Sequence, residues 1–156
     1  MIQETRYKAV VIPRINGKYV AVRDFKNQEI TFVTGGCKKY ETSRQCALRE
    51  LREETFGALG NLKATDLIYR DTFYSRNRSK RELEKDRREG KVVTMEYNVF
   101  FVDVNIPWVR VEEQFKNGLN RARNIETDKI YLMSKEEYTS RRNIWSFMRE
   151  NIIPLL

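Results

Sequence analysis

The fold is decided by the stretch Gly35-Gly-Cys-Lys-Lys-Tyr-Glu41 and, after seven intervening residues, Arg49-Glu-Leu-Arg-Glu-Glu54. At about 100° per residue, three glutamates of the second part fall within roughly a third of a helix circumference. A separate arc carries the residues suited to burial, which are Ala47, Leu48, Leu51 and Thr55. The stretch therefore predicts a helix over 42–56 with an acidic face and a core face.

The three clustered carboxylates need positive charge nearby, because like charges one helical turn apart repel each other. In one interpretation, Arg49, with Arg44 and Arg52 beside it, forms ordinary ion pairs on a solvated helix face. In the other, the carboxylates bind a divalent metal, since hard cations such as Mg²⁺ take oxygen ligands and keep several waters. Helix composition alone favours the ion-pair interpretation.

The whole stretch resembles the signature of the Nudix hydrolase family. The matching positions are Gly35, Glu41, Arg49, Glu50, Leu51, Glu53 and Glu54. The resemblance implies a loop-helix-loop that binds Mg²⁺ or Mn²⁺ and hydrolyses a diphosphate linked to another group. It also implies an α/β/α sandwich with a mixed central sheet over nearly the whole chain. On this resemblance, the metal interpretation becomes the favoured one.

Carried over position by position, the resemblance assigns roles to the side chains of the helix. It makes Glu53 and Glu54 metal ligands and Glu50 either a ligand or a base. Arg49 becomes the residue that orients the carboxylates. Glu41, in the loop before the helix, either braces that loop or joins the metal network.

Two departures from the family pattern lie beside this chemistry. At the entry, counting back from the loop glutamate makes Gly35 the motif glycine, and Thr34 precedes it. This leaves open whether Gly35 or Thr34 supplies the backbone carbonyl that the resemblance places at the metal. After the helix, the family has glycine where this chain has Phe56. We expect a shifted helix end, with Gly57 or Gly60 in the left-handed turn.

Length and composition indicate one domain over residues 1–156, large enough to bury a core without structural metal. No apolar run approaches the ~20 residues that span a bilayer. The N-terminal residues lack the apolar core of a signal peptide. We therefore expect a soluble, cytoplasmic protein with no membrane partner, and the oligomeric state stays open.

The two cysteines, Cys37 and Cys46, both fall in the motif region. A bridge between them would have to link the loop to the helix that follows. Because disulfides are rare in reducing compartments, we expect free thiols, with Cys46 as a small packing residue.

The chain contains no histidine. This excludes Ser-His-acid and Cys-His catalysis, His-ligated zinc and an imidazole general base. Carboxylates with a metal are the natural remaining means of activating water near neutral pH.

The rest of the pattern predicts strands that alternate with helices. Strands are expected at 8–15, 18–23, 29–33, within 62–74, 92–104 and 130–133, and the Asn16-Gly17 dipeptide is a hairpin signal. The strand at 92–104 leaves neither face polar and should be covered on both sides. One or two helices are expected within 135–153, with Trp145, Met148 and Ile152 buried.

A charged insertion at about 75–91 interrupts this order and should face solvent. Together with the net charge of +8, it suggests a polyanionic partner, although such a segment is as often a solvated helix that binds nothing. The candidate phosphate-binding residues are Lys38, Lys39, Arg76, Arg78, Lys80 and Arg81. Phe73 and Tyr74 beside the insertion could stack on a base, but core packing at a strand end is the commoner role.

A late acidic turn resembles the corresponding segment of many Nudix enzymes. This resemblance implies Glu126 as an additional ligand or general base, with Asp128 second, and a plain acidic turn is the alternative. Glu96 is a third possibility, because a carboxylate in an apolar strand needs a partner or a metal.

These observations predict a Nudix hydrolase that uses Mg²⁺ or Mn²⁺ to cleave a phosphoanhydride bond. The basic surface favours a phosphate-rich small molecule or an RNA 5′ end, with capped RNA and diphosphoinositol polyphosphate first. Nucleoside triphosphates, dinucleoside polyphosphates and nucleotide sugars stay open as substrates. A Nudix scaffold that only binds nucleotide or RNA, and a basic interaction protein, are the non-enzymatic alternatives.

Overall fold

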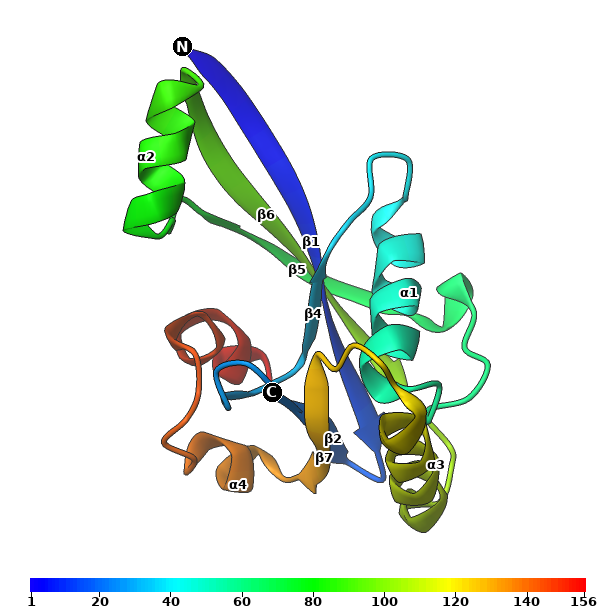
Figure 1. Ribbon diagram of the computed structural model, residues 1–156. Coiled ribbons are helices and arrows are strands. Elements are labelled where there is room, and N and C mark those ends of the chain that lie inside the picture. The colour runs from blue at the N-terminus through cyan, green and yellow to red at the C-terminus, as the bar shows by residue number, and fades with distance from the viewer.

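The computed structural model describes all residues from Met1 to Leu156 and is built around one mixed sheet (Figure 1). The strands are Ile2–Ile15 (β1), Lys18–Asp24 (β2), Ile30–Thr31 (β3), Val33–Gly36 (β4), Ile68–Ser75 (β5), Lys91–Asp103 (β6) and Thr127–Met133 (β7). The α-helices are Ser43–Thr55 (α1), Lys80–Arg88 (α2), Trp108–Arg121 (α3) and Lys135–Thr139 (α4). Short helical turns complete the chain at Ala64–Asp66, Met148–Ile152 and Ile153–Leu155.

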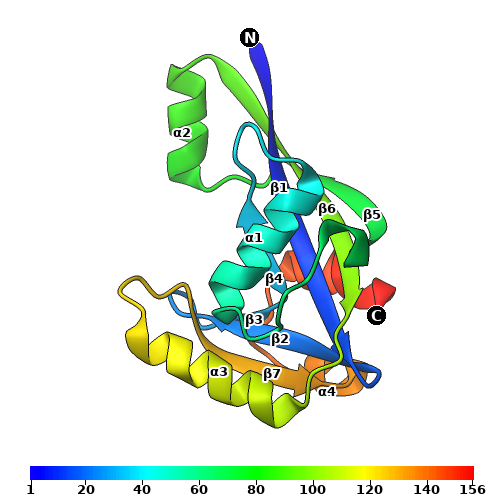
Figure 2. The same cartoon turned by 90° about the vertical axis from the view of Figure 1, so that its right-hand side faces the viewer.

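The sheet divides into two branches that share β1. Its main order is β3-β2-β1-β6-β5, and β1 and β6 run parallel while their other pairings are antiparallel. The hairpin at Asn16-Gly17 joins β1 to β2 as predicted, but the two strands pair only at 14–15 and 18–19. Earlier in β1, residues 8–11 pair with β4 instead of β2. β2 continues into the second branch with β7 and β3, so β4 and the start of α1 lie near the divergence (Figure 2).

Two apolar clusters cover the two faces of the sheet. One contains side chains of α1 and α3, including Leu51, Val111 and Phe115. The other contains α4 and the C-terminal segment, including Tyr138 and Met148. The predicted α/β/α sandwich with a mixed sheet is therefore confirmed. In β6, residues 99–102 are buried on both faces, as expected for a covered strand.

The sequence interpretation missed α3. Its signal is present, because Val111, Phe115 and Leu119 are spaced by four residues and lie on one helical face. Pro107 stands at the N-cap, where a missing N–H costs nothing.

The N-terminal strand is longer than predicted, and the insertion packs against that extra length. Residues 2–7 of β1 pair in parallel with 91–96 of β6, although most of their side chains are exposed. α2, inside the insertion, lies beside this extension at the far end of the molecule from α3 and α4 (Figure 1). Its side chains face solvent as expected, except that of Asp86.

The C-terminal region is less helical than expected. α4 ends at Thr139, and an irregular segment separates it from the turns at 148–155. Met148 and Ile152 are buried as predicted, whereas Trp145 is only partly buried. The strand expected within 62–74 is present as β5 and ends one residue later, at Ser75. No helix in the structure combines the length and hydrophobicity that crossing a bilayer requires.

Candidate functional site

The loop before α1 is fixed by Arg49, which reaches back from the helix. Its guanidinium donates to both carboxylate oxygens of Glu41, at 2.6 and 2.8 Å, and to the carbonyl of Gly36 at 2.9 Å. It also donates to Glu50 at 2.9 Å. Thr42 caps the helix in a capping box with Gln45. The orienting role expected of Arg49 and the bracing role expected of Glu41 both have contacts that suit them.

Gly35 makes room for Glu50. A Cβ placed on Gly35 would lie 1.9 Å from Cδ of Glu50, so no other residue fits there without moving that carboxylate. The neighbouring Gly36 has nothing within 4 Å of the same position. A glycine is therefore required where β4 passes under the acidic face of α1.

The expectation of free thiols is wrong, because Cys37 and Cys46 form a disulfide. The loop folds back from the end of β4, which brings the two Cα atoms to 5.2 Å. That separation is ordinary for a bridge. Cys46 is fully buried, as expected of a packing residue.

The helix end agrees with the expectation in part. Gly57 and Gly60 both have positive φ angles, of 69° and 80°, but the left-handed stretch begins one residue before Gly57. Phe56 itself takes the left-handed conformation at φ 54°, and Gly57 follows it at φ 69°. The bulky residue is held there because its ring packs edge-on against Phe115, with ring centroids 5.1 Å apart, and lies over Gly118. Packing against α3 thus offsets the backbone strain of the residue that replaces the family's glycine.

Three carboxylates from two elements converge at the C-terminal end of α1. Oxygens of Glu50, Glu54 and Glu126 lie within 4.8 Å of one another. The hydroxyl of buried Thr127 donates to the carbonyl of Glu54 at 2.6 Å, which ties the start of β7 to the helix. Two acids predicted from the motif and one from the late turn therefore meet.

The electrostatics of this cluster are unfavourable without a cation. Oε2 of Glu54 is buried and has no hydrogen-bond partner. Burial, and then the charge of Glu50, raise the pKa of Glu54 well above its ordinary value. Burial and the same neighbour raise the pKa of Glu126 as well. Three converging carboxylates, two of them buried, fit a hard divalent ion that takes oxygen ligands.

Glu53 is not part of the cluster. Its side chain is half exposed and lies 3.3 Å from Nη1 of Arg49. Asp128 is also outside the cluster. Nε and Nη2 of Arg23 donate to its two carboxylate oxygens, each at 2.8 Å. Glu96 has the partner that its apolar strand demanded, since Nδ2 of Asn98 donates to it at 3.0 Å.

A cavity of about 380 Å³ opens beside the cluster, with Glu54 and Lys8 in its wall. Tyr97 and the partly buried Trp145 form an aromatic side of the same wall. In the sheet, Lys8 lies opposite Gly36 of β4 and Tyr97 of β6. Lys8 did not stand out in the sequence, because only the strand register brings it here.

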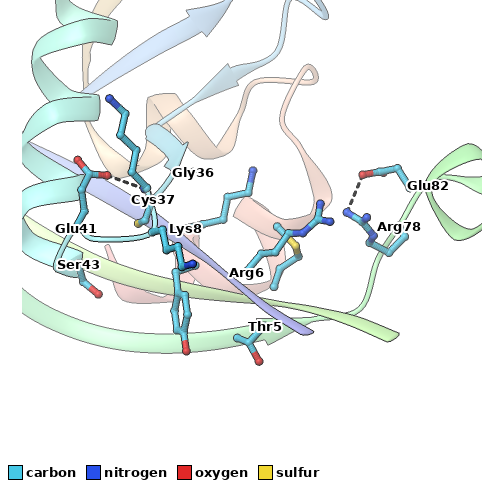
Figure 3. Close-up of a pocket in the computed structure, with 13 residues that line it drawn as sticks. Thr5, Arg6, Lys8, Gly36, Cys37, Glu41, Ser43, Arg78 and Glu82 are labelled. Carbon is cyan, nitrogen blue, oxygen red and sulfur yellow. Dashed lines mark hydrogen bonds and ion pairs between the residues drawn. The ribbon is translucent and has the colours of Figure 1, made fainter. Parts of the chain in front are cut away.

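A second cavity, of about 690 Å³, is lined by three of the predicted basic residues (Figure 3). Lys38 and Lys39 line it together with Lys8. Arg78 also lines it, but its side chain is bound by Asp86 at 3.0 and 3.1 Å and by Glu82 at 2.7 Å. Arg78 is thus not a free phosphate ligand in this structure.

The remaining basic candidates, Arg76, Lys80 and Arg81, are exposed and line neither cavity. Of the aromatic pair beside the insertion, Phe73 packs against Phe147, with ring centroids 6.3 Å apart. Tyr74 is largely exposed.

Comparison with known proteins places the chain in a family. The model of the NUDIX domain matches residues 5–146. Among solved structures, a variant of the Bacillus subtilis pyrophosphohydrolase BsRppH matches with a TM-score of 0.62 at 18% identity, covering 95% of this chain and 76% of that one. The E. coli dihydroneopterin triphosphate pyrophosphohydrolase matches with the same score at 16% identity, covering 96% and 93%. At these identities the structures support the fold alone. Comparison with curated sequences finds no significant match.

Proposed function

The chain belongs to the Nudix family of hydrolases, which act on phosphoanhydride bonds, and from that premise we propose that it cleaves such a bond in a highly anionic substrate. Capped RNA and diphosphoinositol polyphosphate are the substrates proposed first. Mg²⁺ or Mn²⁺ is the proposed cofactor. Nucleoside triphosphates, dinucleoside polyphosphates and nucleotide sugars are the substrates against which this proposal has to be tested.

The single observation that carries the proposal is the unpaired, buried Oε2 of Glu54. A buried carboxylate oxygen without a donor costs free energy, so a folded protein retains it only where something compensates. Glu50 and Glu126 add negative charge at the same point rather than removing it. A divalent cation is the partner that satisfies all three side chains.

Glu50, Glu54 and Glu126 would hold the ion, and Glu53 is near enough on the helix to join them after a change of rotamer. When bound, such an ion neutralises charge on diphosphate oxygens and lowers the pKa of a coordinated water.

Arg49, Glu126 and Glu50 have different roles around the ion. Arg49 fixes Glu50 through a 2.9 Å hydrogen bond and holds the loop through Glu41. Glu126 comes from a different element and is exposed, so its carboxylate is the better placed proton acceptor for an attacking water. Glu50 is packed between Gly35 and Arg49 and has less freedom to act as a base.

The preference for a highly anionic substrate rests on charge. The chain carries a net charge of +8, and the larger cavity has Lys8, Lys38 and Lys39 in its wall. A positive rim raises the local concentration of polyanions and speeds their capture. A nucleotide sugar has only one diphosphate, so this positive charge would attract it less strongly than a polyanion.

The test combines one variant with a substrate panel. Glu54→Gln is expected to remove metal-dependent turnover and to weaken Mn²⁺ binding measured by titration calorimetry. Glu112→Gln, an exposed glutamate on α3, is the matched control. The panel contains capped RNA, diphosphoinositol polyphosphate, nucleotide sugars and triphosphates, with products identified by mass. Full turnover by Glu54→Gln would refute the site, and turnover of nucleotide sugars alone would refute the substrate class.

A further inference from the structure

The larger cavity lies outside the carboxylate cluster, between the motif loop and the insertion (Figure 3). One wall is the loop at 36–39, and another is β1 from Thr5 to Lys8. Arg78 and Glu82, where α2 begins, close the third side. Figure 3 shows the Arg6 side chain extending from β1 toward the Arg78–Glu82 pair, while Thr5 points the other way.

The cavity carries a surplus of positive charge that the protein does not neutralise. Lys8, Lys38 and Lys39 line it and form no ion pair with any carboxylate. Arg6 is paired only with the partly exposed Glu4. The carboxylate of Glu41 is also in the wall, but it already forms an ion pair with Arg49. Like charges gathered around one hollow repel each other, and an anion relieves that repulsion.

Lys8 connects this cavity to the carboxylate cluster. It lines both cavities, and Glu54 lines the smaller one. Arg6 and Lys8 are two positions apart on β1 and project from the same face of the strand. Their Cα atoms are thus about 7 Å apart. This spacing is close to one nucleotide step along an extended single strand.

We propose that the larger cavity binds the phosphodiester groups that follow the 5′ end of a single-stranded oligonucleotide. This inference rests on the proposed function, because it places the terminal phosphoanhydride of the same ligand at Glu50, Glu54 and Glu126. The chain of phosphates passes Lys8 and continues along Arg6, with Lys38 and Lys39 on the opposite wall. A compact inositol phosphate fills only one of the two cavities. The extended ligand uses both, which favours RNA over the inositol substrate.

The experiment measures binding apart from chemistry. The probe is a decauridylate with a 5′-triphosphate and a 3′-fluorescein, followed by anisotropy in EDTA so that no cleavage occurs. The test variant is Arg6→Gln/Lys39→Gln, which removes one cation from each wall. Lys116→Gln/Lys135→Gln removes two exposed lysines elsewhere and is the control with the same net charge.

The test variant is expected to weaken binding about tenfold and to lower the slope of log Kd against log salt by about two, because each substitution removes one cation that faces a phosphate. In Mg²⁺, its KM for the oligonucleotide should rise while kcat stays close to that of the control. Equal behaviour of the two double variants would overturn the inference. A rise in KM for diphosphoinositol polyphosphate alone would also overturn it.

Failure of the proposed function gives a different result. Binding that depends on Arg6 and Lys39 without any cleavage of the oligonucleotide in Mg²⁺ or Mn²⁺ would support the cavity assignment and refute the proposed reaction. Cleavage with no dependence of KM on these two residues would do the reverse.

Discussion

Two parts of the molecule, the motif at 35–54 and the insertion at 76–90, each contain a buried acid, Glu54 and Asp86, but only Asp86 is paired with an arginine. In the insertion, buried Asp86 is met by both Nε and Nη2 of Arg78. In the motif, Glu54 is as deeply buried but its Oε2 has no donor. A paired buried acid is explained by folding, whereas an unpaired one calls for a ligand.

The first test of this comparison displaces a carboxylate of the cluster without substituting any of the acids. Gly35→Ala puts a methyl group where Cδ of Glu50 lies, so the carboxylate must move. Because displacements of about 1 Å at a catalytic group can cost about a hundredfold, kcat/KM should fall by roughly that factor. Gly36→Ala meets nothing within 4 Å and is the adjacent control. Steady-state kinetics with Mg²⁺ would show whether the two glycines differ, and equal rates would contradict the assigned packing.

The second way is to compare stabilities. Arg78→Met leaves Asp86 buried without its partner, and the melting temperature should drop by several degrees. Glu54→Gln replaces an unpaired buried acid with a neutral amide of the same shape, so in EDTA its melting temperature should stay the same or rise. Differential scanning calorimetry would measure both, with Arg81→Met on the exposed side of α2 as the control. A large loss of stability in Glu54→Gln would mean that Glu54 has a structural partner.

The third way is to release the motif loop, which is also cross-linked. Cys37 and Cys46 close a loop with a sequence separation of 9. A disulfide that closes a loop of this length increases the free energy of unfolding by about 2–3 kcal/mol. Urea denaturation should therefore show a lower midpoint in dithiothreitol than in oxidising buffer. The variant Cys37→Ser/Cys46→Ser should match the reduced protein and respond no further. A midpoint independent of dithiothreitol in the wild type would exclude the bridge in solution.

The sequence could predict the features that depend on local spacing, but not the contacts that depend on how distant segments fold together. The motif specified α1, the contacts of Arg49 and Glu41, and two of the three clustered carboxylates, since each depends on local spacing. The charge of Arg78 was visible, but its pairing with Asp86 depends on how a charged segment folds onto itself.

Long-range contacts explain the other misses. Lys8 joins the site only through the register of β1 with β4 and β6, and nothing in its local sequence marks it. Phe56 occupies a left-handed position because α3, a helix not predicted, supplies Phe115 and Gly118. Cys37 meets Cys46 because the loop between them turns back on α1.

The smallest expected effect concerns pH, where two acids of the motif act with opposite sign. Hydrogen bonds from Arg49, and then from the Lys38 backbone, lower the pKa of Glu41 to about 2. Its ordinary value is about 4.3, so the unfolded chain takes up a proton first as the pH falls. The stabilising contribution of Glu41 is thus complete above about pH 5 and is lost progressively toward pH 2. Glu54, with a raised pKa, loses its contribution as the pH increases instead.

Glu41→Gln separates these two effects. Without the carboxylate at residue 41, the free energy of unfolding should fall less steeply between about pH 5 and pH 2 than in the wild type. Urea denaturation in EDTA at several pH values in this range would measure the slope. Glu113→Gln, an exposed glutamate on α3, should keep the wild-type slope. If Glu41→Gln and Glu113→Gln gave the same slope, Arg49 would not hold Glu41 ionised in solution, and the motif loop would lack the electrostatic anchor that Arg78 gives the insertion.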